Sequence, residues 1–394
     1  MTEASTVDPG AGGKAGRLPL AMRLLANLVV LGLSTTIALG AAEIAVRVVA
    51  PQQLIMIRPD IWQAADSLGW RHSPNLETQV NTGERRVTLY TDEEGFRVGR
   101  RGRREAADSI LLIGDSFMAA LQVEHYQSLA GLMEDTLRGP ERQTVSVRNS
   151  GVGSWGPSQY LIFGRQRLVN HQYGLALVAI FTGNDLVRER QEYIEKFPRG
   201  ERRRFRVPFS FSPEVWIESV ARPINDALES RSHLFVFLKA RLEPLRIRLG
   251  LSVAYVPRGL LKARADGPEW DVTADILADL ASVADSVAVP ILFVLIPAEY
   301  QVDERLFASH AAAFGVDQSA VDLDQPNVRL RGEMDARGLA VVDALPAFRD
   351  AARNGTDLYG AVDSHLSPSG HWVLFRLLRE ELEARMRWTS PSGS

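Results

Sequence analysis

The sequence predicts a three-layer α/β/α domain with a parallel sheet, preceded by one N-terminal transmembrane helix. Two observations lead to this fold class. From residue 109 onward, short and continuously apolar segments alternate with helical ones, which is typical of parallel strands covered by helices on both faces. Ahead of that region an uncharged run of 19 residues extends from Leu24 to Ala42. As a helix this run would span roughly 28 Å, close to the hydrocarbon thickness of a bilayer.

The composition excludes several classes of protein. The chain has 394 residues, of which 45% are hydrophobic and 24% charged, enough for one large globular domain or two medium ones. Its net charge of −3 gives no reason to expect a nucleic-acid partner. The sequence contains no cysteine, which excludes disulfides, thiolate metal sites and cysteine nucleophiles.

The N-terminal region is interpreted as a tail followed by an anchor. Residues 1–16 are small and polar, so residues 1–19 are expected to form a disordered cytoplasmic tail. Residues 20–50 are expected to form the transmembrane helix. A cleaved signal peptide is the alternative, because residues 40–42 (Gly-Ala-Ala) are the small residues that a peptidase needs. We favour the anchor, because the apolar run is long for a signal peptide and the helical pattern continues to Ala50.

Charges that flank the apolar run predict its orientation. Lys14, Arg17 and Arg23 lie on the N-terminal side, and positive charge favours the cytoplasmic face of a membrane. We therefore expect a single-pass protein of the inner (cytoplasmic) membrane whose domain is extracytoplasmic.

Residues 51–105 carry few helix signals and are expected to be an extended lead-in segment with short strands. Two basic runs, residues 97–104 and 199–206, are expected to be solvated loops. Contact with lipid headgroups or an anionic polymer is the alternative interpretation of these runs.

The domain is expected at residues 106–388, followed by a disordered tail at 389–394. Its predicted strands cover residues 109–113, 144–148, 175–181, 290–296 and 339–342, and its predicted helices cover 127–137, 158–169, 273–287 and 368–386. The alternation stops between Val187 and Gly267, where an Arg-rich stretch and two helical patterns indicate a mostly helical insertion. Because the insertion follows a strand end, it can overhang a site at that edge of the sheet.

A serine follows the first predicted strand of the domain, in the turn Gly114-Asp115-Ser116. The carboxyl ends of parallel strands meet at one edge of an open α/β sheet, where such folds hold their sites. Gly-Asp-Ser is also an ordinary turn sequence. A catalytic role for Ser116 therefore requires a base and oxyanion donors from elsewhere in the chain.

Two later strand ends offer hydrogen-bond donors. Residues 149–156 (Asn-Ser-Gly-Val-Gly-Ser-Trp-Gly) form a glycine-rich turn whose backbone N–H groups can point into a cleft. Their spacing fits neither dinucleotide-binding nor Walker phosphate loops. After the next strand comes Asn184, whose amide is a suitable donor to a developing oxyanion or, alternatively, the cap of a following helix.

A histidine close behind an aspartate lies near the C-terminus, in Asp363-Ser364-His365. An imidazole can remove the proton of a serine, and a carboxylate can fix its tautomer and stabilise the imidazolium. His371 falls within the start of the last predicted helix and is expected, like the remaining histidines, to be structural or exposed.

The order of these segments resembles the SGNH hydrolase (GDSL-like) superfamily: serine first, then the glycine turn, then Gly-Asn-Asp, then Asp-x-His. The resemblance covers roughly residues 109–387 and implies an SGNH or flavodoxin-like fold. The strings GWRHSPN, TDEEGFRV and PILFVLIPAEYQV are similar to the membrane-anchored bacterial branch found with exopolysaccharide genes and related to alginate-type O-acetyltransferases.

This resemblance implies a role for each motif residue. Ser116 would be the nucleophile, His365 the general base and Asp363 its partner. Asn184, with backbone N–H groups at Ser116 and at the turn of Gly153 and Ser154, would form the oxyanion hole. No cofactor and no metal ion is implied.

Two positions depart from the family pattern. Ser154 stands where the family usually has glycine, so a positive φ there would strain the serine. The usual Asp-x-x-His is shortened here to Asp363-x-His365, which resembles the polysaccharide acyltransferase-type subset. The shortening leaves Asp357 as a second candidate for the orienting acid.

The leading functional expectation is a membrane-anchored serine esterase or O-acyltransferase that acts on acyl esters, acetyl esters in the first place, of an extracytoplasmic polysaccharide. The direction depends on whether water or a sugar hydroxyl attacks the acyl-enzyme. One alternative is a lipase or thioesterase-like hydrolase of membrane-derived acyl chains. Another is a non-catalytic polysaccharide-assembly subunit, against which the complete set of motif residues argues. The oligomeric state is left open.

Overall fold

The computed structural model describes residues 19–52, 54, 61–82, 85–106, 108–139, 142–186, 224, 227–228, 231–248, 269–314, 317–361 and 364–388. The expected tails and most of the expected insertion lie outside these residues. Within the chain, two compact units are distinguished, Met1–Ala50 and Pro51–Ser394.

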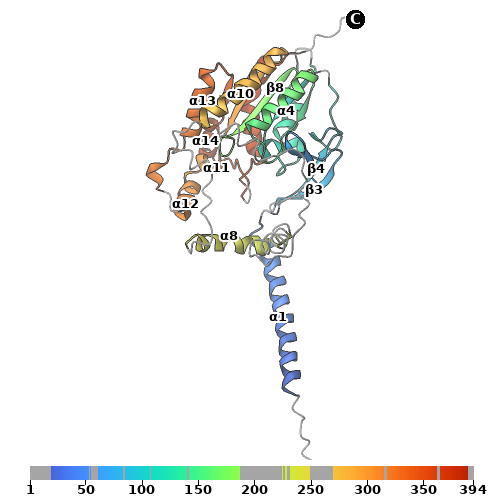
Figure 1. Ribbon diagram of the computed structural model, residues 1–394, viewed down its shortest axis with the longest axis vertical. Coiled ribbons are helices and arrows are strands. Elements are labelled where there is room, and N and C mark those ends of the chain that lie inside the picture. Colours follow the sequence, from blue (N-terminus) through green and yellow to red (C-terminus); the bar gives the residue numbers. More distant parts are fainter. Residues whose placement is uncertain are drawn as a thin grey trace, which may run out of the picture. The chain divides into compact units, whose positions relative to one another are not determined.

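The described part of the first unit forms one helix, α1 (Leu20–Val49), drawn in blue in Figure 1. Its segment Met22–Val49 has a mean hydropathy of 1.9 and is long and apolar enough to cross a membrane, and none of this segment is buried. The helix therefore has the length and composition that the sequence predicted for residues 20–50, with Glu43 and Arg47 paired near its C-terminal end.

The second unit is built on an eight-stranded sheet with the order β10-β9-β8-β6-β7-β5-β4-β3. The strands of this sheet are β3 (Glu77–Asn81), β4 (Arg86–Thr91), β5 (Arg97–Val98), β6 (Asp108–Ile113), β7 (Val145–Asn149), β8 (Leu175–Phe181), β9 (Ile291–Ile296) and β10 (Val341–Asp343). A separate hairpin is formed by β1 (Trp62–Ala65) and β2 (Gly69–His72).

The sheet is mixed rather than wholly parallel. Strands β6 to β10 are mutually parallel, as the sequence predicted. The lead-in segment adds β3, β4 and β5 to the same sheet, all in antiparallel pairing. The lead-in is therefore a structural part of the sheet, which its sequence alone did not indicate.

Helices cover both faces of the sheet (Figure 1). They are α2 (Ser116–Ala119), α3 (Leu129–Thr136), α4 (Pro157–Asn170), α10 (Glu269–Ser286), α11 (Glu299–Val302), α12 (Glu304–Phe314), α13 (Gln325–Ala336), α14 (Leu345–Arg353) and α15 (Pro368–Arg385), with short 3₁₀ helices η1 (His125–Gln127) and η3 (Gln318–Ala320). Helix α8 (His233–Arg248) lies in the expected insertion and has the helical conformation predicted there.

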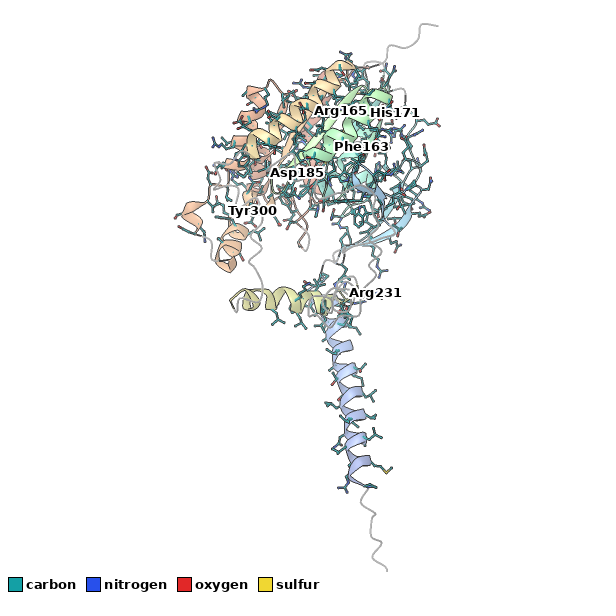
Figure 2. All side chains as sticks on the ribbon, in the orientation of Figure 1. Phe163, Arg165, His171, Asp185, Arg231 and Tyr300 are labelled. Atoms are coloured by element: carbon teal, nitrogen blue, oxygen red, sulfur yellow. The ribbon has the colours of Figure 1, made fainter. Side chains whose placement is uncertain are left out.

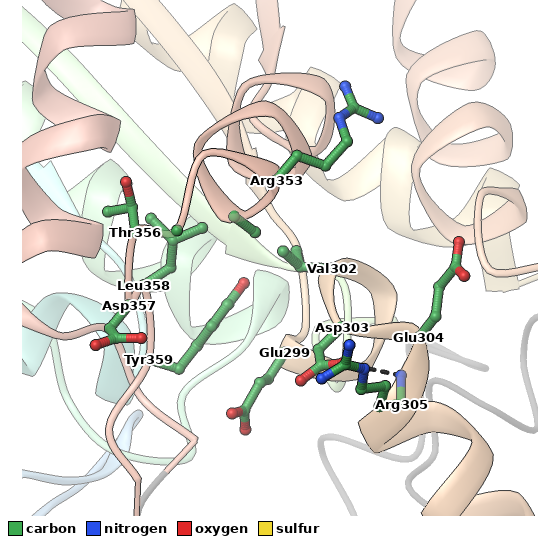
Figure 3. A pocket seen from close by; sticks show the side chains of 12 residues that line it. Glu299, Val302, Asp303, Glu304, Arg305, Arg353, Thr356, Asp357, Leu358 and Tyr359 are labelled. Carbon is green, nitrogen blue, oxygen red and sulfur yellow. Dashed lines mark hydrogen bonds between the residues drawn. The ribbon is translucent and has the colours of Figure 1, made fainter.

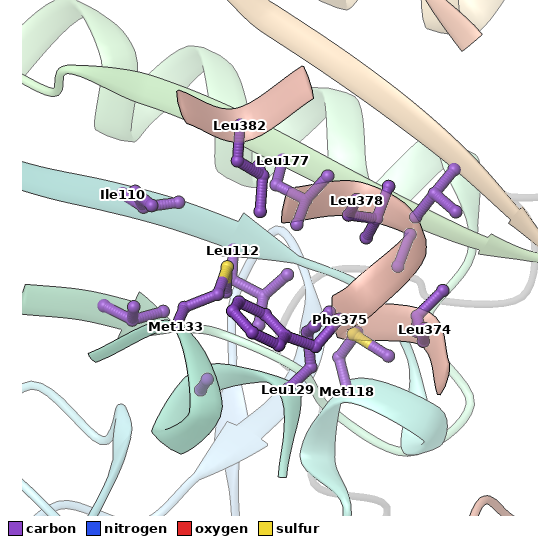
Figure 4. Close-up of a cluster of buried hydrophobic side chains, with 14 of the residues drawn as sticks. Ile110, Leu112, Met118, Leu129, Met133, Leu177, Leu374, Phe375, Leu378 and Leu382 are labelled. Atoms are coloured by element: carbon purple, nitrogen blue, oxygen red, sulfur yellow. The ribbon is translucent and has the colours of Figure 1, made fainter. Parts of the chain in front are cut away.

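Side chains along β6 belong alternately to two core layers, one on each face of the sheet, because successive side chains of a strand point to opposite faces. Ile110 and Leu112 pack with α3, α14 and α15 on one face, shown in Figure 4. Leu111 and Ile113 pack with α4, α10 and α13 on the other face. All four side chains are fully buried, so β6 is a central strand and its carboxyl end is held from both sides.

Candidate active site

Ser116 begins helix α2 directly after β6 ends at Ile113. The Asp115 carboxylate caps this helix, because its Oδ1 accepts the Phe117 N–H at 2.9 Å. Gly114 is required at the turn, since a Cβ there would lie 2.4 Å from Met118 Cγ. The strand-to-helix turn thus places the serine hydroxyl at the carboxyl edge of the sheet.

Helix α2 has only one turn, so side chains must satisfy the carbonyl groups at its C-terminal end. Asn149 Nδ2 donates to the Met118 carbonyl at 2.8 Å. The Arg97 guanidinium donates to the carbonyls of Ala119, Ala120 and Val123. Asn149 and Arg97 are directly opposite each other on β7 and β5.

Arg97 corrects the expectation that residues 97–104 form a solvated loop. Its side chain is 0% exposed, whereas Arg100, Arg101 and Arg103 are exposed. Burial lowers the pKa of Arg97 to about 10, which keeps the guanidinium charged at neutral pH. Positions 97 and 98 belong to the sheet and positions 99–104 to the loop beyond it, because β5 ends at Val98.

His365 approaches the nucleophile from the other end of the chain. Its Nε2 lies 2.8 Å from Ser116 Oγ, which is hydrogen-bond distance. The His365 ring packs against Phe117, with the ring centroids 4.8 Å apart. Its backbone carbonyl accepts the Gly360 N–H at 3.0 Å, which closes the loop that presents the imidazole.

The structure describes only one of the two candidate partners of His365, which are Asp363 and Asp357. Asp363 lies outside the described residues, so its role as the partner of His365 remains a prediction. Asp357 lines two neighbouring cavities with Tyr359, and its backbone carbonyl accepts the Ser367 hydroxyl at 2.6 Å. Ser367 in turn caps α15, so the structure gives Asp357 a place in the loop that precedes this helix.

Ser154 adopts a left-handed backbone conformation, at the position where a glycine was expected. Its φ is +64°, in the left-handed region that costs a residue with a Cβ roughly 1–2 kcal/mol. The turn is held by two indole N–H groups: Trp70 Nε1 donates to the Gly153 carbonyl at 2.8 Å, and Trp155 Nε1 donates to the Trp70 carbonyl at 2.9 Å. These bonds attach the β1–β2 hairpin to the turn and fix its strained backbone.

Asn184 is exposed in the turn after β8, and its neighbour Asp185 fixes that turn. The buried Asp185 carboxylate (labelled in Figure 2) accepts the Phe181 N–H at 2.9 Å and the Tyr160 hydroxyl at 2.8 Å. Burial, followed by the charge of Asp185, raises the pKa of Tyr160 well above its usual value, so Tyr160 remains a donor.

One cavity of about 710 Å³ contains these elements together. It is lined by Ser116, His365, Gly153, Ser154 and Asn184, which are the predicted nucleophile, base and oxyanion-hole residues. The chemistry available is removal of the serine proton by an imidazole, beside backbone and amide donors. No three His, Asp or Glu side chains among the described residues are grouped to hold a metal ion.

The other five residues that line this cavity were not predicted from the sequence, and two of them are tryptophans. Trp62 and Trp70 reach it from the β1–β2 hairpin, and they occur in the lead-in segment without a recognisable spacing. Leu121 and Ala119 complete an apolar lining.

Two further cavities continue from the first. The adjoining cavity, of about 570 Å³, shares Gln122 with it. The next, of about 510 Å³, shares Glu299, Asp357 and Tyr359 with the second and is shown in Figure 3. The shared residues make a row of depressions that begins at Ser116.

His371 has a structural role in the described part of the chain. It is 1% exposed in the first turns of α15, where its Nδ1 accepts the Leu129 N–H at 3.3 Å. Burial, aided by the charge of Arg97, lowers the pKa of His371 to about 3, so its imidazole is neutral and can accept this bond.

Comparisons with known proteins add structural matches only. No protein-family model and no curated protein matches the sequence. Solved structures similar to this chain include a lipolytic protein of the G-D-S-L family from Veillonella parvula (10% identity, TM-score 0.35, covering 70% of this chain and 97% of that one). A lipase/acylhydrolase from Enterococcus faecalis matches at 13% identity and TM-score 0.38, covering 72% and 99%.

An acetylxylan esterase from Geobacillus stearothermophilus, solved as a catalytic mutant, matches at 12% identity and TM-score 0.37, covering 73% of this chain and 99% of that one.

Asp115 is the buried acid next to the nucleophile. Burial raises its pKa to about 6, opposed by the Phe117 N–H and the charge of His365. Above that pH the ionised carboxylate favours the protonated imidazole. We predict that Asp115→Asn, which keeps the acceptor for Phe117, shifts the acid limb of the kcat/KM profile to lower pH by roughly one pH unit.

The exposed Asp350→Asn variant is the control and should leave the profile in place. Stability gives a second readout: a pKa raised from 3.8 to about 6 means that wild-type stability falls as the pH rises through this interval, and Asp115→Asn should lack this fall. An acid limb that moves to higher pH in Asp115→Asn would contradict the electrostatic coupling.

Proposed function

We propose that this protein is a serine esterase or O-acyltransferase that acts on acyl esters, acetyl esters in the first place, of an extracytoplasmic polysaccharide. The observation that carries the proposal is the 2.8 Å distance between His365 Nε2 and Ser116 Oγ in a cavity open to substrate. A serine becomes a nucleophile when an adjacent base accepts its proton.

The reaction follows from this geometry in two halves. His365 accepts the Ser116 proton as Oγ attacks the acyl carbonyl, and the oxyanion so formed is stabilised by Asn184 and by backbone N–H groups at Gly153 and Ser154. The tetrahedral species collapses, the sugar oxygen leaves with the proton from His365, and the acyl group remains on Ser116. Water or a second hydroxyl then attacks the acyl-enzyme as His365 accepts its proton. The bond between the acyl carbon and Ser116 Oγ breaks, Oγ takes that proton back, and a free acid or a new ester is released.

The row of cavities supports an extended substrate. Depressions that share Gln122, and then Tyr359, lead away from the nucleophile across the surface. A small ester needs only the first cavity, whereas a polymer can occupy neighbouring ones as well. The apolar lining at Leu121 and Ala119 favours the second candidate, hydrolysis of membrane-derived acyl chains.

Ser116→Ala tests the nucleophile. The purified protein should release 4-nitrophenol from 4-nitrophenyl acetate, and the alanine variant should lose this activity by several orders of magnitude, because the acyl-enzyme cannot form. Ser282→Ala, an exposed serine on α10, is the matched control and should keep the wild-type rate. Equal activity in the wild-type and Ser116→Ala proteins would overturn the proposal.

We also propose that α1 anchors the protein in the inner membrane with the enzyme unit outside the cytoplasm. Its length and hydropathy support a span, and Lys14, Arg17 and Arg23 precede or begin it. Alkaline phosphatase fused at the C-terminus should be active in the wild type, and replacing the three cations with glutamate should lower its activity. An inactive alkaline phosphatase fusion, together with an active C-terminal fusion to a reporter enzyme that works only in the cytoplasm, would contradict this orientation.

A further inference from the structure

We propose that the β1–β2 hairpin is a carbohydrate platform, on which the rings of Trp62 and Trp70 stack against the pyranose that carries the ester. The inference rests on the proposed function and names the part of the substrate that the site recognises. It assigns a binding role to a hairpin that lies outside the eight-stranded sheet.

The hairpin register places both tryptophans on one face. Trp62 pairs with His72, and Trp70 pairs with Ala64. Side chains two residues apart on a strand share a face, so Trp62 and Trp70 are diagonal neighbours across the hairpin. Both line the cavity that contains Ser116.

Gly153 connects this platform to the nucleophile. A Cβ at Gly153 would lie 3.8 Å from Trp62 Cζ2 and 3.9 Å from Ser116 Cβ. The indole edge and the serine therefore flank the same glycine. An ester whose carbonyl carbon is attacked by Ser116 therefore has the Trp62 ring beside it. We assign this side of the site to the alcohol part of the ester, which is the sugar.

The two indoles offer ring surface rather than N–H donors to a ligand. Trp62 Nε1 is buried, with no hydrogen-bond partner among the described residues, although the side chain as a whole is partly exposed. Trp70 Nε1 is already bonded to the Gly153 carbonyl. The part of the two indoles that a ligand in the cavity can contact is therefore their flat apolar ring surface.

Flat aromatic surface suits the C–H face of a pyranose, which is broad and rigid and leaves the ring hydroxyls free to bond at the edge. Gln122 and Asn184 supply polar groups in the lining of the same cavity. The rigid hairpin adds little conformational cost on binding, because Trp70 and Trp155 already attach it to the core.

Three substrates separate a sugar platform from an acyl-chain site. Glucose pentaacetate carries acetyl esters on a pyranose, triacetin carries them on an open chain, and tributyrin lengthens the acyl group on that open chain. We expect Trp62→Leu, which keeps an apolar side chain but removes the flat ring, to lower kcat/KM for glucose pentaacetate about tenfold through KM, as expected for an aromatic contact anchor. Its kcat/KM for triacetin and tributyrin should stay within about threefold of wild type.

Two further variants complete the test in the full-length protein in mild detergent. Trp62→Phe should recover most of the glucose pentaacetate activity, because it restores an aromatic face. Trp372→Leu, at an exposed tryptophan on α15, should behave as wild type with all three esters. The triacetin rate reports whether each variant keeps an intact active site.

The outcomes are distinct. An equal loss on all three esters, a selective loss on tributyrin, or a wild-type enzyme that hydrolyses triacetin but not glucose pentaacetate would overturn the platform and leave the esterase proposal standing. A wild-type protein that hydrolyses none of the three esters would instead overturn the proposed function, and the platform with it.

Discussion

The candidate site depends on how a single helical turn is held at its carboxyl end. Helix α2 carries Ser116 at its first position, and Arg97 and Asn149 satisfy the carbonyl groups at its other end. A short helix has little stability of its own, because forming its first turn is unfavourable in free energy and only the addition of further residues offsets this. The two side chains therefore hold the helix that carries the nucleophile, while the His365 imidazole lies at hydrogen-bond distance from the Ser116 hydroxyl.

This constraint explains why the lead-in segment is part of the sheet. Arg97 and Asn149 are partners across β5 and β7, so the Arg97 guanidinium reaches α2 when β5 is added to the edge of β7. Burial of an unpaired guanidinium costs several kcal/mol, which its bonds to three carbonyls offset. The pKa values of His72 and His371 are lowered to about 4 and about 3, chiefly by burial. The positive charge of Arg97 contributes to both shifts, because it disfavours a second positive charge nearby.

Much of this architecture was predictable from the sequence. The apolar runs located β6, β8 and β9 because central parallel strands are apolar on both faces, and β-branched residues located β7. The serine, the glycine turn and Asn184 follow β6, β7 and β8 directly. Ser154 was also foreseen as a strained position, since a glycine was expected there, and its φ is +64°.

The remaining features depend on pairing between distant segments, which local patterns do not encode. Arg97 lies in a run of arginines, and nothing in RVGRRGRR marks its first residue as buried and Arg100, Arg101 and Arg103 as exposed. Trp70 joins the site through hydrogen bonds with Gly153 and Trp155, more than 80 positions away along the chain, and Trp62 joins it through the pairing of β1 with β2. Asp363 remains a prediction from the resemblance.

The most direct measurement of the central claim is labelling with a fluorophosphonate, which reacts covalently with a serine that an adjacent base activates. Peptide mapping by mass spectrometry should find the label on Ser116 in the wild-type protein. The label should be lost in His365→Ala, because the imidazole 2.8 Å away no longer accepts the proton. Label on another residue, or equal labelling of Ser116 with and without His365, would contradict this account.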